Sequence, residues 1–428
     1  MDVAPDRRAA ARARPRVGLR DTLSLLRRNR DFSRLYGAQL ISFGGDWFAS
    51  VALVGLVNDL TGSAALTTLA LVTQMVSIAV FSPVGGHLAD RFDRQRLMVG
   101  ADAARVVLAL GYLLVDRPGE VWMAFVITAA ISALGAVFEP ASGAAIPNLV
   151  DREDLPAANV LVGSAWGTML AVGAAVGGLV AATLGRDAAF VGDAASFGVS
   201  GLLLLGIRRR FAEPRERGGP RMAEAIAETV RYARRDHRVL ALLTVKGGFG
   251  LSGGVIGLLA IFALEVFEAG DRGTGILWAF RGLGALVGPF LVRRFTHSLR
   301  SLFAAIGTAF AVYGAFYAIF PFMGGLWAAA PFVFLAHLGG GAQWTLSTYG
   351  LQRIVPDRIR GRVMSFDYGF VTLSLGTPIL LSGWAADHAD PRLVMAVLAG
   401  VALAYAAVWS ALTAPIRRSA ADLEPAEA

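Results

Sequence analysis

Long apolar stretches alternate with short polar segments along the whole chain of 428 residues. A helix needs about 20 mainly apolar residues to cross about 30 Å of hydrocarbon, and we count twelve stretches of that kind. The first six cover residues 33–57, 66–88, 97–115, 121–147, 157–184 and 188–206. The other six cover residues 240–267, 273–294, 299–320, 325–352, 362–385 and 392–414. The pattern predicts an all-α integral membrane protein with twelve transmembrane helices.

One long polar segment separates the first six stretches from the second six. Together with the apolar stretches, this segment divides the chain into five predicted parts. These are an Arg-rich tail at 1–31, a six-helix bundle at 32–206, a linker at 207–238, a second six-helix bundle at 239–414 and a tail at 415–428. Arg91-Phe92 after the second stretch recurs as Arg294-Phe295 after the eighth. We therefore expect two bundles related by pseudo-symmetry.

Two short amphipathic segments flank the first bundle. Leu19, Leu23 and Leu26 predict a short surface helix before the first span. In the linker, a weak apolar stripe predicts a second surface helix over residues 222–235.

Arginines collect in alternate loops, as the positive-inside rule expects for an even number of spans. One set of loops is rich in arginine, and the opposite set holds only Arg117, Arg186, Arg272 and Arg392. We therefore expect a multi-pass protein of the inner (plasma) membrane with both termini in the cytoplasm.

Composition agrees with a membrane environment, and the high net charge does not indicate a nucleic-acid partner. The chain is 55% hydrophobic and 17% charged, with a mean hydropathy of +0.56, whereas a soluble domain carries about 25% charged residues. A net charge of +8 and a pI of about 10.3 would indicate nucleic-acid binding in a soluble protein. Here the arginine distribution across the membrane explains the charge, so no nucleic-acid partner is expected.

Several kinds of chemistry lack the residues that they need. The chain has no cysteine, and its five histidines stand without an i,i+4 partner, so we expect no metal site. There is no phosphate-binding loop of the Walker type, and the single lysine, Lys246, lies in an apolar stretch. We therefore expect no ATP, no cofactor, no catalytic residue and no enzyme activity.

The most specific motif follows the second stretch, where the sequence reads Gly-His-Leu-Ala-Asp-Arg-Phe-Asp-Arg-Gln-Arg over residues 86–96. It resembles the G-x-L-x-D-R-x-G-R-[KR] signature of the major facilitator superfamily, with Asp93 where glycine is usual. The resemblance implies a two-bundle transporter fold. It also implies that the motif is a conformational latch, which holds the halves together in the outward-facing state. Its members here are Gly86, Asp90, Arg91, Arg94 and Arg96.

Further segments narrow the resemblance to one branch of that superfamily. Residues 29–32, 39–42, 45–47, 138–141 and 355–363 together resemble enterobactin-type siderophore exporters and macrolide or multidrug efflux proteins. In the fifth stretch, Gly173, Gly177 and Gly178 resemble the G-P-x-x-G-G element of drug:proton antiporters, with Ala174 in place of the proline. Close helix packing explains these glycines equally well.

Ionisable residues inside the apolar stretches are candidates for ion coupling, because a charge in the bilayer centre is costly. Asp46 and Glu139 are candidate proton carriers, and Arg105 is their candidate partner. The alternative is a fixed ion pair of Arg105 with Asp46 or Glu139, which would only hold helices together. Four further charged residues are expected near helix ends, where contact with water is the simpler interpretation. They are Asp102, Asp193, Lys246 and Asp367.

A last group of residues has polar or aromatic side chains deep in the apolar stretches and is a candidate lining for a substrate cavity. Its members are Gln39, Trp47, Gln74, Trp166, Arg281, Gln343 and Trp344. For the tryptophans the alternative is an interfacial or lipid-facing position.

These observations predict a proton-coupled exporter of small amphiphilic molecules of the drug, macrolide or siderophore kind. The expected partners are a small-molecule substrate, protons and membrane lipid, and we expect a monomer. An importer or a lysophospholipid flippase of the same fold is the first alternative. A receptor or scaffold without transport is the second.

Overall fold

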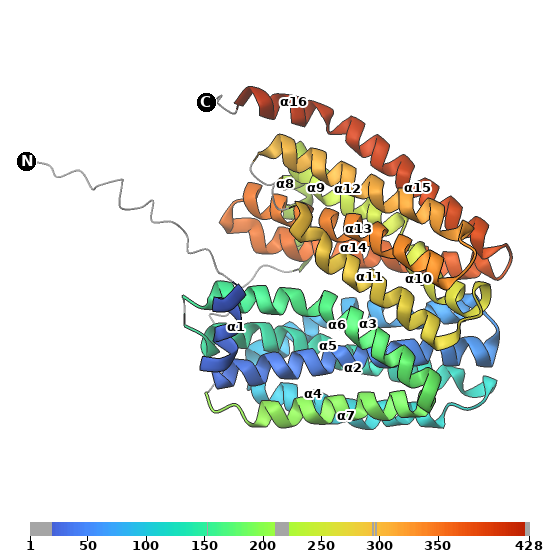
Figure 1. Ribbon diagram of the computed structural model, residues 1–428. Helices are drawn as coiled ribbons and strands as arrows, with labels where there is room; N and C mark the ends of the chain where they lie inside the picture. Colours follow the sequence, from blue (N-terminus) through green and yellow to red (C-terminus); the bar gives the residue numbers. More distant parts are fainter. Residues whose placement is uncertain (1–18, 152, 210–221, 293–294, 296–297, 424–428) are drawn as a thin grey trace, which may run out of the picture.

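The computed structural model describes residues 19–151, 153–209, 222–292, 295 and 298–423. The described residues form two bundles of long helices, one from each half of the chain, that lie side by side (Figure 1). Helices α2 to α7 build the N-terminal half, and helices α9 to α15 build the C-terminal half. The first and last described helices, α1 (Leu19–Arg28) and α16 (Ala414–Leu423), lie at the same end of the molecule.

The N-terminal half contains six long helices, and side-chain caps fix where several of them begin. Asn29 accepts a hydrogen bond from the backbone N–H of Phe32, and Ser63 and Asp93 cap the next two helices in the same way. The helices are α2 (Arg30–Thr61), α3 (Ala64–Arg91), α4 (Arg94–Gly111), α5 (Val121–Leu149), α6 (Leu155–Leu184) and α7 (Arg186–Leu205).

The C-terminal half repeats this plan with one irregular helix. Its first crossing is made in three pieces, α9 (His237–Leu251), α10 (Gly254–Ile261) and a π-helical turn η4 (Phe262–Val266). The remaining helices are α11 (Gly270–Val292), α12 (Leu299–Ile319), α13 (Leu326–Ile354), α14 (Asp357–Ala386) and α15 (Pro391–Leu412).

Within the described residues, eleven helical segments are long and apolar enough to cross a membrane. The helix α13 is also long enough, at 29 residues, but three consecutive glycines together with His337 and Gln343 lower its apolar content. It lies against α11 and α12 as an integral member of its bundle. The prediction of an all-α membrane protein built from two six-helix bundles is therefore confirmed.

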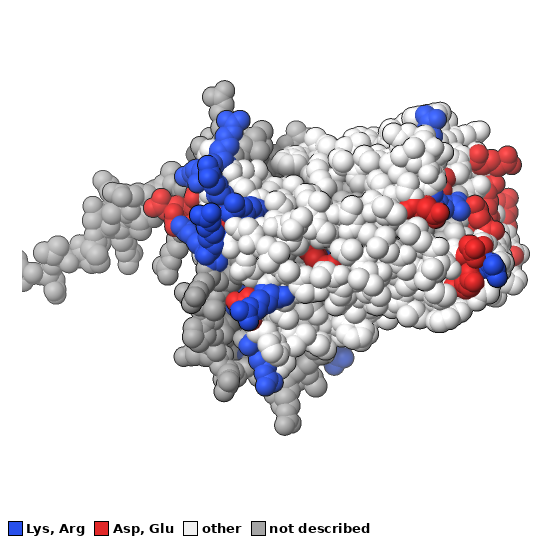
Figure 2. Space-filling model, turned by 90° about the horizontal axis from the view of Figure 1, so that it is seen from below, with Lys and Arg blue, Asp and Glu red and all other residues white. Residues whose placement is uncertain are grey.

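On the face that Figure 2 shows, most charged residues lie at the two ends of the molecule, and the broad belt between them is nearly free of charge. Lys and Arg dominate the end at which α1 and α16 lie, which we call the basic end. Asp and Glu dominate the opposite end, which we call the acidic end. The belt is the surface expected to face lipid, since apolar side chains cost nothing in hydrocarbon.

Helices form in both segments for which the sequence predicts a surface helix, and both lie at the basic end. They are α1 and the linker helix α8 (Met222–Arg235), which is tied to α14 by an ion pair between Glu228 and Arg362. The tails at 1–18 and 424–428 and the linker segment 210–221 lie outside the described residues.

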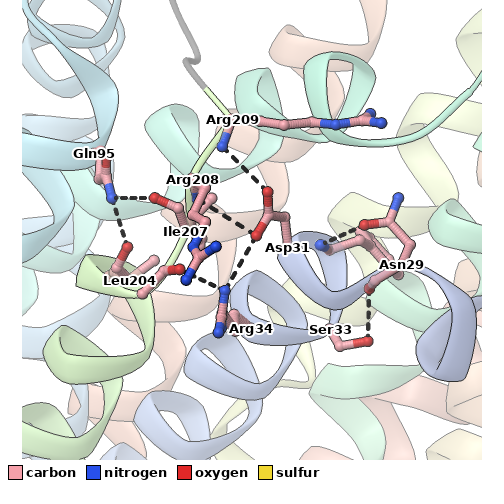
Figure 3. Close-up of polar contacts among 11 residues, drawn as sticks. Asn29, Asp31, Ser33, Arg34, Gln95, Leu204, Ile207, Arg208 and Arg209 are labelled. Atoms are coloured by element: carbon pink, nitrogen blue, oxygen red, sulfur yellow. Dashed lines mark hydrogen bonds and ion pairs between the residues drawn. The ribbon is translucent and has the colours of Figure 1, made fainter.

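The start of the linker is fastened to the beginning of α2 (Figure 3). The Asp31 carboxylate accepts the backbone N–H groups of Arg208, at 3.4 Å, and Arg209, at 3.1 Å. Gln95 at the start of α4 donates to the carbonyl oxygens of Leu204, at 2.7 Å, and Ile207, at 3.1 Å. These contacts satisfy one carbonyl group in the last turn of α7 and further backbone groups just beyond it, and they fix the point where the chain leaves the N-terminal half.

Glycines set the spacing of α6 against both halves. A Cβ atom on Gly173 would lie 2.6 Å from the carbonyl oxygen of Gly44, and one on Gly177 would lie 2.7 Å from the Cα atom of Phe48. A Cβ atom on Gly178 would lie 2.7 Å from the carbonyl oxygen of Asp271 in α11. The glycine motif therefore serves close helix packing in this structure, inside the N-terminal half and across to the C-terminal half.

Polar contacts join the two halves at the acidic end. Asp387 at the end of α14 accepts the backbone N–H groups of Ala64, at 2.6 Å, and Ala65, at 3.1 Å. A carboxylate at the N-terminus of α3 is stabilised by the helix dipole and the free N–H groups. Arg186 of the N-terminal half pairs with Asp271 of the C-terminal half at 2.8 Å. The acidic end is therefore closed.

The same helices separate toward the basic end. At the acidic end, a Cβ atom on Gly383 of α14 would lie 2.6 Å from the carbonyl oxygen of Ala64 in α3. Nearer the basic end, a Cβ atom on Gly369 of α14 or on Gly86 of α3 would meet no atom within 4 Å. A cleft between the halves therefore opens at the basic end.

We predict that Gly178→Val prevents the acidic end from closing. The added side chain would overlap the backbone of α11, and overpacking of this kind costs about 1–3 kcal/mol. Because the chain contains no cysteine, Thr68→Cys provides a single label at a position that is fully buried by closure. A membrane-impermeant maleimide should label Thr68→Cys faster in the Gly178→Val background than in the parent.

Gly163→Val is the matched control, because a Cβ atom on Gly163 in the same helix would meet nothing within 4 Å. Labelling that stays slow in the Gly178→Val background would show that the α6–α11 contact does not control closure.

Candidate functional site

Charged side chains meet in the middle of the N-terminal half. Asp46 lies near the middle of α2, and the guanidinium of Arg105 comes from the neighbouring α4. The charge of Arg105 acts on Asp46, Asp102, Asp193 and Glu139, so these five side chains form one electrostatic group, which we call the acidic cluster.

Arg105 is held in place by contacts from three neighbouring helices, α2, α5 and α7. It donates to the hydroxyl oxygen of Ser42 at 3.2 Å and to the carbonyl oxygen of Ile131 at 3.3 Å. Its guanidinium lies over the rings of Phe138, at 5.6 Å, and Phe197, at 5.0 Å. Such fixed surroundings keep a cation in a defined position inside the bundle.

The ion pair that Arg105 makes is not one that the sequence analysis weighed. Its guanidinium lies 3.6 Å from the carboxylate of Asp102, one turn earlier in α4. The salt bridges of the described residues do not join Arg105 to Asp46 or Glu139. Both candidate carriers therefore lie within reach of the positive charge without being locked to it.

The expectation that Asp102 and Asp193 lie near helix ends is wrong. Asp102 is fully buried at the middle of α4, and Ser200 of α7 donates a hydrogen bond of 2.6 Å to it. Asp193 is buried within α7 and faces α2. The sequence does contain a signal for this arrangement, since Asp193, Ser196 and Ser200 share one helical face.

Glycines make room for the acidic cluster. A Cβ atom on Gly45 would lie 2.6 Å from the carboxylate oxygen of Asp193, so only glycine lets α2 and α7 approach at this level. A Cβ atom on Gly135 of α5 would collide with the guanidinium of Arg105. The Gly-Asp-Trp segment at 45–47 thus places Asp46 beside Asp193.

A small cavity of about 30 Å³ adjoins the acidic cluster on its acidic-end side. Asp46 and Asp193 lie at its inner end, and Gln74 is part of its lining. Tyr112 and Thr128, which hydrogen-bond to each other at 2.8 Å, line its outer part. A polar cavity of this size has room for one or two water molecules.

Within the acidic cluster, Glu139 lies on the side that faces the basic end, opposite the small cavity. It is exposed on α5, next to the kink-forming residue Pro140. Its charge acts on Tyr368 of α14, which is also exposed although it belongs to the opposite half. Glu139 therefore lines the cleft that opens at the basic end.

Arg281 occupies the boundary between the two halves. It comes from the middle of α11, and its guanidinium lies 5.8 Å from the ring of Trp47 and 5.9 Å from the ring of Trp166. These two tryptophans belong to the opposite half. Three of the predicted cavity residues are thus brought together by the structure.

The C-terminal half contains its own buried ion pair. Lys246 of α9 pairs with Asp367 of α14 and donates to the hydroxyl oxygen of Thr348 at 2.8 Å. Its ammonium group also lies 4.8 Å from the ring of Trp344. Both charged side chains are buried, so the expectation that they contact water is wrong for them too.

The remaining predicted residues lie in several different places. Gln39 is buried and donates to Ser142 within the N-terminal half, while Gln343 is fully buried in α13 without a hydrogen-bond partner among the described residues.

The latch residues lie at the basic end of the N-terminal half. Arg94 is buried and donates to the carbonyl oxygen of Ala144 at 2.9 Å, which ties α4 to α5, whereas Arg91 and Arg96 are exposed. The Asp90 side chain lies outside the described part of the structure.

Two six-helix bundles that surround a cleft, with charged groups buried at mid-depth and an apolar belt outside, define a membrane transporter rather than an enzyme. The chain belongs to the major facilitator superfamily, because the family model described as Major Facilitator Superfamily matches residues 35–366.

Known relatives agree with this assignment at low identity. The MFS-type transporter YkuC of Bacillus subtilis (strain 168) is 27% identical over 62% of this chain and 64% of its own length. Macrolide efflux protein A of Streptococcus pyogenes is 33% identical over 29% of this chain and 31% of its own length. The putative bacilysin exporter BacE of Bacillus subtilis (strain 168) is 26% identical over 61% and 65%. The matches thus cover less than two thirds of each relative.

Solved structures share the fold at still lower identity. A POT family transporter in complex with 5-aminolevulinic acid superposes with a TM-score of 0.73 at 10% identity, over 91% of this chain and 97% of that one. An inward-facing bacterial homologue of the human lysosomal transporter Spinster superposes with a TM-score of 0.70 at 16% identity, over 96% and 100%.

We predict that Asp367→Asn lowers stability strongly, because it leaves the Lys246 ammonium buried without its counter-ion. Breaking a buried pair from one side costs about 3–5 kcal/mol, whereas replacing both partners by apolar residues is often neutral. The double variant Lys246→Met with Asp367→Leu should therefore recover most of the lost stability. Thermal unfolding of the purified protein in detergent measures both effects.

Asp116→Asn serves as the control, since Asp116 and Arg117 form an exposed pair at 3.4 Å, and exposed pairs contribute little. Equal unfolding temperatures for the parent and Asp367→Asn would show that the buried pair does not stabilise the fold.

Proposed function

We propose that this transporter exports small amphiphilic molecules in exchange for protons, by exposing its central cleft alternately to the two sides of the membrane. The observation that carries the proposal is the acidic cluster, in which the charge of the Arg105 guanidinium acts on four carboxyl groups and pairs with one of them, Asp102. A structural ion pair needs only one carboxylate for one arginine, so the additional carboxyl groups indicate a further role.

The charge balance of the cluster supports proton binding. Ionised carboxylates at Asp46, Asp102 and Asp193 against one guanidinium would leave two negative charges without a partner inside the bundle, and Glu139 would add a third at the cleft. A charge at the bilayer centre costs about 2.5–3.5 kcal/mol on insertion scales, and like charges repel each other in addition. Protonation of the carboxyl groups removes both penalties, so the cluster is suited to bind and release protons.

The arrangement of the acids supports a proton path with two ends. Asp46 and Asp193 face the small polar cavity on the acidic-end side, where one or two waters could carry a proton inward. Glu139 faces the cleft at the basic end. Arg105 lies between these two groups and is electrostatically coupled to both, so movement of the helices can change which acid it compensates.

Relatives support the direction of transport. One matching protein is described as a macrolide efflux protein and another as a putative bacilysin exporter, so export is the direction that both names give. The Trp47 and Trp166 rings beside the Arg281 guanidinium suit an amphiphilic molecule better than a small inorganic ion.

The charge distribution supports an orientation in the membrane. Because arginine-rich loops stay in the cytoplasm, we assign the basic end to the cytoplasmic side of the plasma membrane, together with both termini. The structure would then represent the inward-facing state, in which a cytoplasmic substrate can enter the cleft.

Export itself is tested by a resistance and uptake screen in a cell that lacks its own efflux pumps, repeated with a protonophore. Expression should lower the accumulation of at least one amphiphilic compound, and the protonophore should abolish this effect. Unchanged accumulation across a broad panel would count against export.

We predict that Asp46→Asn reduces pH-gradient-driven flux to near background in proteoliposomes, because the amide occupies the same space but carries no proton. Counterflow without a gradient should persist, since it needs substrate exchange only. Glu139→Gln should weaken the coupling in the same direction.

Asp116→Asn, at an exposed site outside the acidic cluster, should leave both fluxes unchanged. Gradient-driven flux of Asp46→Asn at the parental rate would remove Asp46 from the proton path.

We also propose that the motif over residues 86–96 latches the two halves at the basic end in the outward-facing state. In the present state a Cβ atom on Gly86 would meet no atom within 4 Å, so the close approach that a latch needs belongs to the other state. We predict that Asp90→Asn slows turnover but leaves substrate affinity unchanged, as measured by flux and equilibrium binding on the same preparation. Full turnover would show that the motif does not work as a latch here.

A further inference from the structure

Arg281 is the charged residue at the centre of the molecule for which the mechanism above has no use. The acidic cluster has Arg105, and Lys246 is paired with Asp367. Among the described residues, Arg281 makes neither an ion pair nor a hydrogen bond, and its Nε atom is buried without a partner. A guanidinium that is partly shielded from water at this depth is stabilised by an anion, and the described part of the chain does not supply one.

The surroundings of Arg281 form a built site. Trp47 of α2 and Trp166 of α6 present their rings to the guanidinium at 5.8 and 5.9 Å, and the two rings meet edge to face at 6.1 Å. Trp278, one turn before Arg281 in α11, packs edge to face on Trp47 at 5.8 Å. Two indole rings therefore border the Arg281 guanidinium across the boundary of the two halves, and a third ring packs against one of them.

The position of Arg281 is fixed by the backbone around it. The next residue, Gly282, touches α6 so closely that a Cβ atom there would lie 2.6 Å from the backbone nitrogen of Ala171. Arg281 itself is partly exposed, and Trp166 is 45% exposed, so an entering molecule can reach both. The positive charge of Arg281 also acts on Tyr313, Tyr317 and His337, which are buried on the C-terminal side.

We propose that Arg281 is the subsite for an anionic group of the transported molecule, and that Trp47 and Trp166 hold its apolar ring or chain. The substrate class is then an amphiphilic organic anion, or a zwitterion whose carboxylate, phosphate or sulfonate group pairs with Arg281. This inference rests on the proposed function, since it takes the cleft to be the substrate site. A guanidinium pairs with such groups through two parallel N–H bonds, and indole rings accept apolar groups of many shapes.

The test uses three probes that share one ring system and differ in charge: naphthylacetate, naphthylethanol and naphthylethylammonium. The full-length protein in phosphatidylcholine nanodiscs is titrated with each probe by calorimetry. The parent should bind the carboxylate most tightly. Arg281→Gln should weaken carboxylate binding about 10- to 100-fold, as expected for a lost charge-assisted hydrogen bond, and leave the alcohol unchanged.

Two further variants separate charge from structure. Arg281→Lys keeps the charge and should restore part of the preference for the carboxylate. Arg272→Gln removes an exposed arginine from the first turn of the same helix and should bind all three probes like the parent. Equal affinity of the parent for the three probes, including no binding at all, would overturn the proposal. So would an unchanged carboxylate preference in Arg281→Gln.

A lipid headgroup is a second source of the same chemistry. Repeating the titration in nanodiscs that contain phosphatidylglycerol distinguishes the two, because competition would assign the subsite to the lipid and unchanged affinity would assign it to a soluble substrate. Either result supports an anion subsite. Selective carboxylate binding without any proton-driven flux would overturn the proposed function alone and leave the subsite in place.

Discussion

The cost of placing a charge in hydrocarbon constrains this structure more than any other interaction. Backbone polar groups are hydrogen-bonded inside the helices. The remaining free-energy cost of placing polar groups in hydrocarbon therefore comes from a small number of ionisable side chains at mid-depth. Each of them points into a bundle or toward the boundary between bundles, where another charge, an aromatic ring or water can compensate it. The glycine contacts follow from this need, since Gly45 and Gly135 provide the space in which the acidic cluster fits.

The two halves meet this constraint in different ways. The C-terminal half pairs its lysine with one aspartate and adds a hydroxyl group and an indole ring, so the result is neutral and fixed. The N-terminal half places several acids around one arginine, and its net charge depends on how many protons it holds. Pseudo-symmetric bundles thus carry unequal chemistry, with rigid pairing on one side and variable protonation on the other.

The sequence predicted the fold well because its signals are local. Apolar length and the alternation of arginines depend on neighbouring residues alone, and together they gave the bundles, the linker helix and the parity of the spans. The cluster was only partly predictable. Asp46, Glu139 and Arg105 stand out as charges in apolar stretches, but the depth of Asp102 and Asp193 depends on where the helices begin, and α4 starts three residues before the predicted span.

Partners that are distant in the chain escaped prediction altogether. Lys246 and Asp367 are separated by 121 positions, and no local pattern joins them. The same holds for Trp47, Trp166 and Arg281, which were named as separate cavity candidates and meet only because α6 crosses α2 and α11 at glycines. Conversely, the segment at 29–32 was noted in the sequence only for its resemblance to a family. In the structure, its side chains cap α2 and bind the backbone at the start of the linker.

Coupling between the proposed proton site and the proposed anion subsite follows from the same electrostatic constraint. When the cleft closes at the basic end, water leaves it, and any charge without a partner then lies in a medium of low dielectric constant. A bound anion compensates Arg281, and protons compensate the surplus acids around Arg105. At each site, closure is less costly when the charge there is compensated. The two species can therefore influence each other without direct contact, because the charge at each site affects how easily the same two bundles come together.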